Sequence, residues 1–307
     1  MASIRTEGST LHIETDMLCA EVHTEGYVSG VAAGTLLDKA TGARDLGFGL
    51  DIVDFLMEPL PDEAGVTENA YHRGDLFHGH LVKRYVELPQ ICTAARKLDF
   101  EVFDHGETVG VRQWYTYREA TYGREAGSVW EQTLVFRDGL RYFLASDEVT
   151  SANGVEHLIL RIDMPGHLKH AAGDSFEQIH LSYHGDIPSS EFVDDFPPDA
   201  RFLYQRGSSP TPERMIRAYQ VRLDGRPGPW LAGMTLDPGV VFEAWCHQRG
   251  YVCFIQEIGG FRVSKGERFG AAYVVGWFDD LAAMHEAHDA YKGASRIRVD
   301  EWGAELE

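Results

Sequence analysis

The sequence predicts an all-β protein of antiparallel strands with one short C-terminal helix. Three observations support this class: runs of β-branched and aromatic residues recur between turn signals, one turn has a hairpin composition, and only one segment has convincing helical spacing. The chain has 307 residues, 44% of them hydrophobic, which is enough for one large β domain. We therefore expect residues 1–307 to form a single domain.

The expected strands fall into two groups along the chain. The first group is predicted to form a meander at residues 10–15, 18–23, 97–104, 108–118, 128–136 and 140–150. An irregular stretch rich in proline, serine and aspartate follows at 186–213, and we interpret it as a long loop over the same domain. The second group lies at residues 216–223, 230–236, 240–246, 251–256 and 269–277.

Two local patterns indicate how the first group pairs. Residues 128–136 carry apolar side chains on both faces, which is typical of a central strand covered on both sides. Arg137, Asp138 and Gly139 follow, and Asp-Gly supplies the positive-φ positions that a tight hairpin turn needs. We therefore expect this strand to pair antiparallel with residues 140–150.

One segment near the C-terminus has the spacing of a helix. Asp279 or Asp280 can cap its start, and Gly293 can end it. We expect this helix to pack on a sheet edge. Its apolar positions are Leu281, Met284, Ala287, His288 and Tyr291.

Charge and composition exclude several classes of partner. The 48 acidic residues outnumber the 28 basic ones, and the formal net charge of −20 repels phosphate backbones and anionic lipids. We therefore expect neither a nucleic acid nor a membrane as partner; the oligomeric state is left open. Residues 1–9 lack an apolar signal region and no run of 18 apolar residues occurs, so we expect a cytoplasmic protein. Four cysteines without C-x-x-C spacing favour neither a disulfide framework nor structural zinc.

The densest polar cluster lies at residues 71–85 and contains Arg73, His78, His80 and Arg84. If the segment is extended, His78, His80 and Arg84 share one face and suit an anionic or hydroxyl-rich ligand. His-x-His on a strand is also a metal pattern, so one alternative is a divalent metal held by His78 and His80 with a third ligand from elsewhere. A purely structural role for these histidines is the other alternative.

A second polar group lies at residues 176–185. Strand alternation places Gln178, His180 and Ser182 on one face, and Tyr183 and His184 follow directly. This group is a second candidate for contact with a ligand.

A third polar group contains Trp245 and His247 and leads into an apolar strand that ends in Glu257. A carboxylate at the end of such a strand is costly to bury unless it is paired, so its pKa is expected to rise toward the range of a general base. The alternative is that Glu257 is a solvated carboxylate at a strand end.

Four segments, at residues 30–42, 77–84, 147–154 and 251–257, follow one another in an order that resembles the galactose-mutarotase-like superfamily. Members of this superfamily are large antiparallel β-supersandwiches that bind sugars. The resemblance covers roughly residues 28–280. The second histidine of the family matches His167, His180 or His184. Residues 30–42 resemble an early strand and turn, 77–84 a His-Gly turn with a nearby arginine, 147–154 the strand and Asn-Gly turn before the second histidine, and 251–257 the strand that ends in the catalytic glutamate.

The resemblance implies an aldose 1-epimerase-like isomerase that acts on a small-molecule carbohydrate or oligosaccharide and requires no cofactor. In such a reaction a carboxylate removes the anomeric hydroxyl proton while a histidine protonates the ring oxygen, so Glu257 would be the base and His180 the acid. His78 would be a third catalytic residue. Together with Arg84, it would hold sugar hydroxyls or an anionic substituent of the substrate by hydrogen bonds. The remaining substrate-binding candidates are His80, Arg73, Tyr183, Trp245 and His247.

Two other functions stay open. In a lyase or hydrolase for a uronate-containing glycoside, Arg84 or Arg73 would neutralise the substrate carboxylate, and His80 or Tyr183 would take the proton. A non-catalytic sugar-binding module would instead use aromatic stacking platforms, with core packing as their ordinary alternative role. The candidates for such platforms are Trp114, Tyr115, Tyr117 and Trp245.

Overall fold

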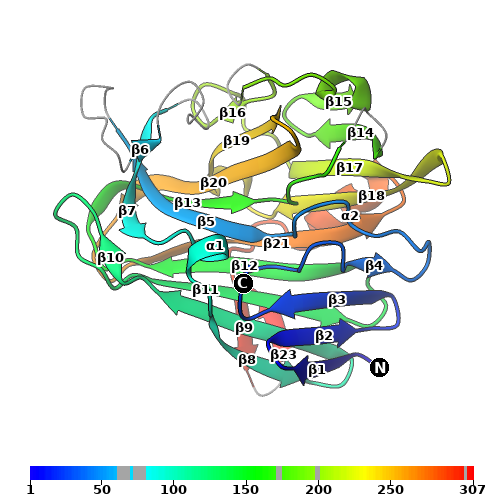
Figure 1. The fold of residues 1–307 in the computed structure, drawn as a ribbon, viewed down its shortest axis with the longest axis horizontal. Helices are drawn as coiled ribbons and strands as arrows, with labels where there is room; N and C mark the ends of the chain where they lie inside the picture. Colours follow the sequence, from blue (N-terminus) through cyan, green and yellow to red (C-terminus); the bar gives the residue numbers. More distant parts are fainter. Residues whose placement is uncertain (61–69, 72–80, 171–174, 198–200, 301–302) are drawn as a thin grey trace.

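Two large antiparallel sheets dominate the structure, a computed structural model that describes residues 1–60, 70–71, 81–170, 175–197, 201–300 and 303–307 (Figure 1). One sheet has nine strands in the order β15-β14-β17-β18-β21-β12-β11-β9-β8. Their bounds are β8 Asp99–Asp104, β9 Thr108–Thr116, β11 Val129–Arg137, β12 Tyr142–Thr150, β14 Phe176–Leu181, β15 Gly185–Pro188, β17 Met215–Leu223, β18 Arg226–Thr235 and β21 Arg268–Phe278.

The other large sheet has eight strands, in the order β10-β7-β5-β13-β20-β19-β16, with β6 beside β7. Their bounds are β5 Ile52–Pro59, β6 Ala70–Tyr71, β7 Lys83–Leu88, β10 Glu119–Ala120, β13 Val155–Asp163, β16 Tyr204–Gln205, β19 Val241–Gln248 and β20 Val252–Val263. This sheet carries the candidate site described below.

Smaller elements surround the two sheets. A four-stranded sheet lies at the N-terminus beside β8 and β9, and a two-stranded ribbon lies at the C-terminus (Figure 1). Among the described residues, no helix is long and apolar enough to cross a membrane. The bounds are β1 Ser3–Glu7, β2 Thr10–Glu14, β3 Leu18–His23, β4 Leu37–Asp38, α1 Ile91–Ala94, α2 Leu281–Ala290, β22 Ile297–Asp300 and β23 Gly303–Leu306.

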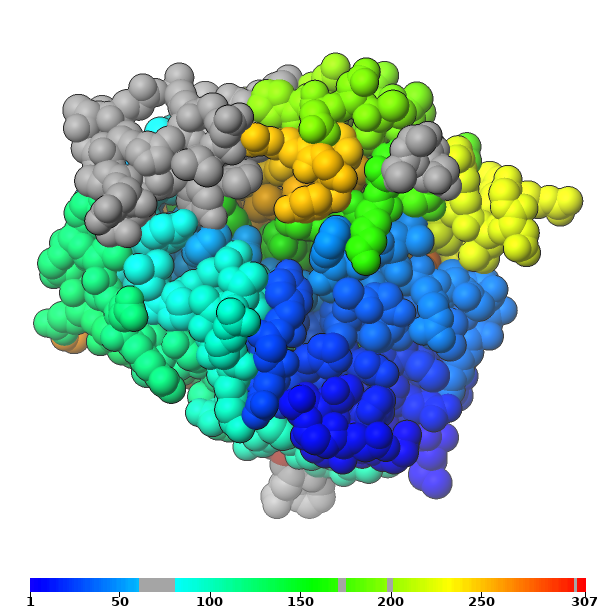
Figure 2. Space-filling view, in the orientation of Figure 1, coloured from blue at the N-terminus to red at the C-terminus, as the bar shows by residue number. Residues whose placement is uncertain are grey.

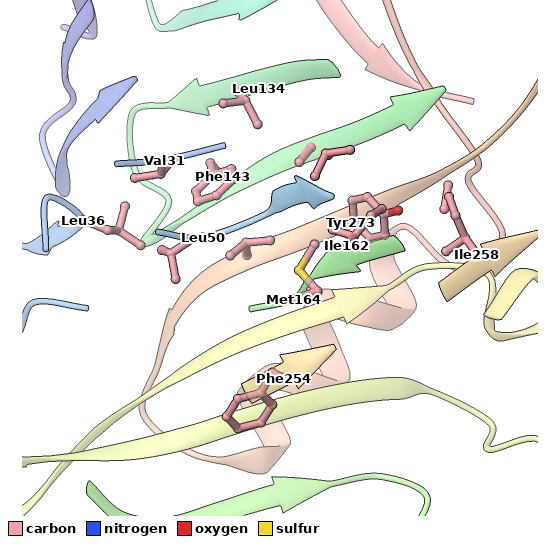
Figure 3. Packing of buried hydrophobic residues seen from close by; sticks show 14 of the residues in the cluster. Val31, Leu36, Leu50, Leu134, Phe143, Ile162, Met164, Phe254, Ile258 and Tyr273 are labelled. Carbon is pink, nitrogen blue, oxygen red and sulfur yellow. The ribbon is translucent and has the colours of Figure 1, made fainter. Parts of the chain in front are cut away.

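The core lies between the two large sheets. Phe143 and Tyr273 from the nine-stranded sheet meet Ile162, Phe254 and other apolar side chains from the eight-stranded sheet (Figure 3). On β13 and β20 these core residues alternate with residues that point to the outer face of the eight-stranded sheet, because successive strand side chains point in opposite directions. The outer face of this sheet is therefore available for polar side chains.

The predicted all-β supersandwich is confirmed, and so is the hairpin between β11 and β12, which pair antiparallel with Gly139 at a φ of 82° in the turn. Residues Trp130–Phe136 of β11 are buried throughout, as expected for a central strand. The helix α2 begins as predicted, because Asp280 caps it by accepting a hydrogen bond from the Ala283 amide at 2.9 Å.

The expected position of α2 at a sheet edge is wrong. Met284 and Ala287 pack with Met234 of β18 and Val274 of β21, which are central strands. The helix lies there because the outer face of these central strands is itself apolar and needs a cover. The ribbon of β22 and β23 completes this cover through Ile297 and Ala304.

Candidate functional site

A cavity of about 660 Å³ opens on the outer face of the eight-stranded sheet. Side chains from β5, β13, β19, β20 and α1 line it, together with residues of the loops that follow β3, β4, β7, β13 and β19. In Figure 2 the blue, cyan, green and orange segments that supply these residues meet near the middle of the face shown. The volume lies within the range of about 300–1,000 Å³ that is typical of small-molecule sites.

Strand β13 supplies the charged floor of the cavity. Leu160 and Ile162 face the core, so Arg161 and Asp163 both face outward, where they line the cavity. Asp163 is directly opposite Ile255 of β20, which also lines it. Two charged residues in the buried part of this strand, which is otherwise apolar from Leu158 onward, are costly to desolvate, which indicates that they serve a purpose other than packing.

A β-bulge brings a second carboxylate to the same cavity. The pairing between β5 and β13 shifts between Leu160 and Ile162, so Asp54 and the next residue, Phe55, both line the cavity instead of alternating. Asp54 Oδ1 accepts hydrogen bonds from Gln90 Nε2 at 2.7 Å and from Cys92 Sγ at 3.2 Å. The sheet irregularity thus places two carboxyl groups in one site.

The two carboxyl groups differ in their tendency to hold a proton. Burial raises the pKa of Asp163 well above its usual range, and the negative charge of Asp54 raises it further. Burial also raises the pKa of Asp54, although hydrogen bonds from Gln90 and the nearby Arg161 oppose this rise. Because like charges in one desolvated site do not both form readily, one carboxyl keeps its proton when the other is ionised.

Two neutral imidazoles accompany the carboxyl pair. His167 Nε2 lies 3.3 Å from Asp163 Oδ2, and burial lowers the pKa of His167 to about 4. Burial, with a smaller effect from His167, lowers the pKa of His247 to about 3. Asp163 Oδ1 and His167 Nδ1 are buried atoms without a hydrogen-bond partner among the described residues, and such atoms are often the ones that a ligand satisfies.

An ionic cluster lies beneath the cavity, on the same face of the sheet. Arg161 donates to Glu257 Oε1 from Nε at 3.0 Å and from Nη2 at 2.7 Å. Lys83 Nζ lies 3.2 Å from Glu257 Oε2 and donates to Glu243 Oε2 at 2.7 Å. The ring of Trp245 lies beside both cations, 5.3 Å from Arg161 Cζ and 5.7 Å from Lys83 Nζ. Only Arg161 of this cluster lines the cavity.

The structure brings some of the predicted site residues to this cavity. His247 and His167 line it, while Trp245 and Glu257 are fully buried beneath it. Trp245 therefore has no ring face exposed for stacking, and Tyr115 and Tyr117 are also buried. The catalytic role of Glu257 stays a prediction, although its oxygens face two cations rather than the cavity.

Other predicted residues lie elsewhere. His180, on β14 of the nine-stranded sheet, contacts Asp186 at 2.7 Å through Nδ1 and does not line the cavity. Tyr183 is in the same region, next to Tyr204. Arg84 donates to Glu58 at 2.8 Å and lies over the ring of Tyr122. The roles predicted for these residues stay predictions.

Arg73, His78 and His80 lie outside the described residues, so their predicted roles are not tested. Within the described ranges, no group of three histidine, cysteine or acidic side chains is arranged to hold a metal ion. The metal predicted at His78 and His80 therefore also stays a prediction.

Most of the charge in the cavity lies on residues that were not predicted as site residues: Asp54, Arg161, Asp163 and Arg249. They lie outside the histidine-rich segments and the strand end on which the predicted site was based. The available signal was the alternation in residues 158–164, where Arg161 and Asp163 interrupt an apolar strand on one face only.

Comparison with known proteins supports the fold but not an activity. No protein-family model and no curated protein matches the chain. An α-mannosidase from Enterococcus faecalis V583 is similar in structure, with 11% identity and a TM-score of 0.52, over 94% of this chain and 32% of that one. At this identity the likeness shows a shared fold.

Two further solved structures are similar at lower scores. A TPR-domain containing protein from Parabacteroides distasonis ATCC 8503 is 12% identical, with a TM-score of 0.48, over 88% of this chain. A galactose 1-epimerase from Lactobacillus acidophilus NCFM is 10% identical, with a TM-score of 0.44, over 91% of this chain and 98% of that one. The chain spans only 47% of the TPR-domain protein and 32% of the mannosidase.

Proposed function

We propose that this chain is a carbohydrate-active enzyme of the aldose 1-epimerase kind, with Asp163 as the acid and Asp54 as the base. The observation that carries the proposal is a pair of carboxyl groups, Asp54 and Asp163, that line one cavity. Burial raises the pKa of both, and it raises that of Asp163 well above its usual range. An acid and a base that coexist in one site are what the interconversion of sugar anomers needs.

In the proposed reaction each carboxyl group transfers a proton when the sugar ring opens and transfers it back when the ring closes. Ionised Asp54 removes the proton of the anomeric hydroxyl while protonated Asp163 gives its proton to the ring oxygen, and the bond between the anomeric carbon and the ring oxygen breaks. The open aldehyde rotates, and the ring closes on the other face as both protons return. His167, in contact with Asp163 at 3.3 Å, orients the acid.

The test follows the optical rotation of freshly dissolved aldoses in the presence of the protein. We expect Asp163→Asn to lower turnover by about 10²–10⁴-fold, because an amide cannot supply the proton. Asp194→Asn, at an exposed position outside the cavity, is the matched control and should change nothing. Glu257→Gln and His180→Gln, measured in parallel, test the assignment that the family resemblance implies. Full activity of Asp163→Asn would make the present assignment wrong.

A second function is favoured by one specific observation: Arg161 and Arg249 line the same cavity as Tyr251 and the neutral His247. This set suits a lyase or hydrolase for a uronate-containing glycoside, in which cations neutralise the substrate carboxylate and a neutral base takes the adjacent proton. Uronate-containing oligosaccharides therefore belong in the same panel. A rise in ultraviolet absorbance from an unsaturated product, without any change in the mutarotation of aldoses, would favour the lyase.

A further inference from the structure

Exposed aromatic side chains gather around the mouth of the cavity. Tyr27 is 41% exposed, Phe48 36% and Tyr251 38%, and all three line the cavity. Single exposed aromatic residues are ordinary on a protein surface, but several at one cavity mouth indicate a binding surface. These residues come from three loops that are far apart in the sequence.

Backbone pairing holds together the chain segments that carry Phe48 and Tyr251. Leu168 bridges to Gly47 on one side and to Val252 on the other, and it exchanges hydrogen bonds of 2.7 and 3.0 Å with Val252. The Phe48 amide also donates to the His167 carbonyl at 3.1 Å. The segments of Phe48, Leu168 and Val252 thus form a short ladder, and the positions of the backbone that carries Phe48 and Tyr251 are set before any ligand binds.

The rings on this ladder are in contact. The centroid of Tyr251 lies 5.1 Å from that of Phe48 and 5.3 Å from that of His167. We call the side chains of Phe48 and Tyr251 the aromatic platform. His167 joins the platform to the acid, because its ring contacts Tyr251 while its Nε2 contacts Asp163.

We propose that the aromatic platform binds a second sugar ring, so that the substrate is a disaccharide or longer oligosaccharide rather than a free monosaccharide. This inference rests on the proposed function, since it takes the reacting ring to be the one at Asp163. Asp163 is only 4% exposed, whereas the platform is exposed, so the two lie at different depths of one cavity. A pyranose presents an apolar face of C–H groups that packs on an aromatic ring and hydroxyl groups that can bond to charged neighbours. Lys169, with Nζ 5.1 Å from the Phe48 ring centroid, is such a neighbour.

The experiment measures binding by calorimetry, independently of turnover, for matched pairs of sugars: glucose with maltose and cellobiose, galactose with lactose, xylose with xylobiose, mannose with mannobiose, and galacturonate with digalacturonate. We expect at least one disaccharide to bind about tenfold or more tightly than its component monosaccharides. Phe48→Ala and Tyr251→Ala should each remove most of this gain. The control is Phe261→Ala, because Phe261 is similarly exposed, at 39%, but does not line the cavity; it should keep the gain.

The outcomes separate this inference from the proposed function. Disaccharides that bind no more tightly than monosaccharides, or a gain that survives in Phe48→Ala and Tyr251→Ala, would overturn the platform alone. A gain that depends on the platform, with no effect of Asp163→Asn on any turnover, would overturn the catalytic assignment and leave the platform standing. A panel in which no sugar binds at all would overturn both.

Discussion

Arg161 and Glu257 face each other across β13 and β20, and two nitrogens of the guanidinium donate to the same carboxylate oxygen, at 3.0 and 2.7 Å. Both side chains are almost completely buried, and the second oxygen of Glu257 lies 3.2 Å from Lys83 Nζ. The carboxylate therefore holds in place the cation that forms part of the cavity floor. A glutamate in this position supports the floor of the cavity from below.

Glu257→Gln should lower the free energy of unfolding by about 3 kcal/mol or more, because it removes the carboxylate that both buried cations, Arg161 and Lys83, contact directly. Urea denaturation at neutral pH measures this change. The control is Glu156→Gln, since Glu156 and Arg262 form an exposed ion pair at 3.6 Å, and its loss should cost well under about 1 kcal/mol. A Glu257→Gln protein with unchanged stability and greatly reduced turnover would instead support the base role that the family resemblance implies.

The pH dependence of turnover should follow the carboxyl pair and not the histidines. Activity should appear as pH rises through the raised pKa of Asp54, which must be ionised, and disappear as pH rises further through that of Asp163, which must be protonated. Since burial lowers the pKa of His167 to about 4 and of His247 to about 3, both stay neutral and add no step near 6.5. A profile of kcat/KM against pH measures this.

The pH profiles of kcat/KM for histidine variants check whether the carboxyl pair or a histidine sets the pH dependence. His167→Gln should reduce turnover through poorer orientation of Asp163, yet both limbs of the profile should remain, because neither belongs to the histidine. A limb near the ordinary pKa of histidine, about 6.5, that vanishes in His167→Gln or His247→Gln would contradict the assignment to the carboxyl pair.

Most of the fold could be predicted from local sequence, because its signals are local. The hairpin turn at Gly139 and the cap at Asp280 each involve residues next to the element that they begin or end. The strands β5 and β13 were missed because charged residues break their apolar runs. Those same charges, Asp54, Arg161 and Asp163, are the ones that line the cavity.

The candidate site could not be predicted to the same extent, because it depends on pairing between distant segments. The bulge that turns Asp54 into the cavity exists only where β5 meets β13, and nothing within residues 52–59 specifies it. The contact of Phe48 with Tyr251 likewise depends on a ladder between three loops. His180 was favoured over His167 because strand alternation gave it polar neighbours, whereas the cavity lies on the other sheet.

A second pair of buried acids should make stability depend on pH. Asp51 and Asp147 are fully buried between the sheets, where Gln132 donates to Asp51 Oδ2 at 3.1 Å and Trp130 donates to Asp147 Oδ1 at 2.9 Å. Burial raises the pKa of Asp51 from 3.8 to about 7 and that of Asp147 well above its usual value. The folded state thus binds protons that the unfolded state releases.

The contribution of this pair to the free energy of unfolding should therefore be largest near pH 4 and fall by about 1.4 kcal/mol per pH unit for each such proton as pH rises toward 7. Asp51→Asn should remove part of this slope and stabilise the protein at pH 8, since an amide needs no proton, and asparagine tolerates the φ of 59° at this position. Asp224→Asn, at an exposed aspartate with a φ of 50°, is the control and should leave the slope unchanged. An Asp51→Asn protein with the wild-type slope would show that this pair carries no excess proton.

Gly47 should be sensitive to substitution because of its close approach to the His167 backbone. A Cβ atom added at Gly47 would lie 1.9 Å from the carbonyl oxygen of His167, and because that atom belongs to the backbone, the loops of Phe48 and His167 would have to separate. Gly47→Ala should lower the free energy of unfolding by about 1–3 kcal/mol, as overpacking typically does. It should also weaken disaccharide binding more than monosaccharide binding, because the displaced backbone carries the aromatic platform, whereas Asp163 is on β13. Gly154→Ala, where a Cβ would meet no atom within 4 Å, is the matched control and should change neither quantity appreciably. Equal weakening of both kinds of sugar in Gly47→Ala would mean that the ladder supports the whole cavity and not the platform in particular.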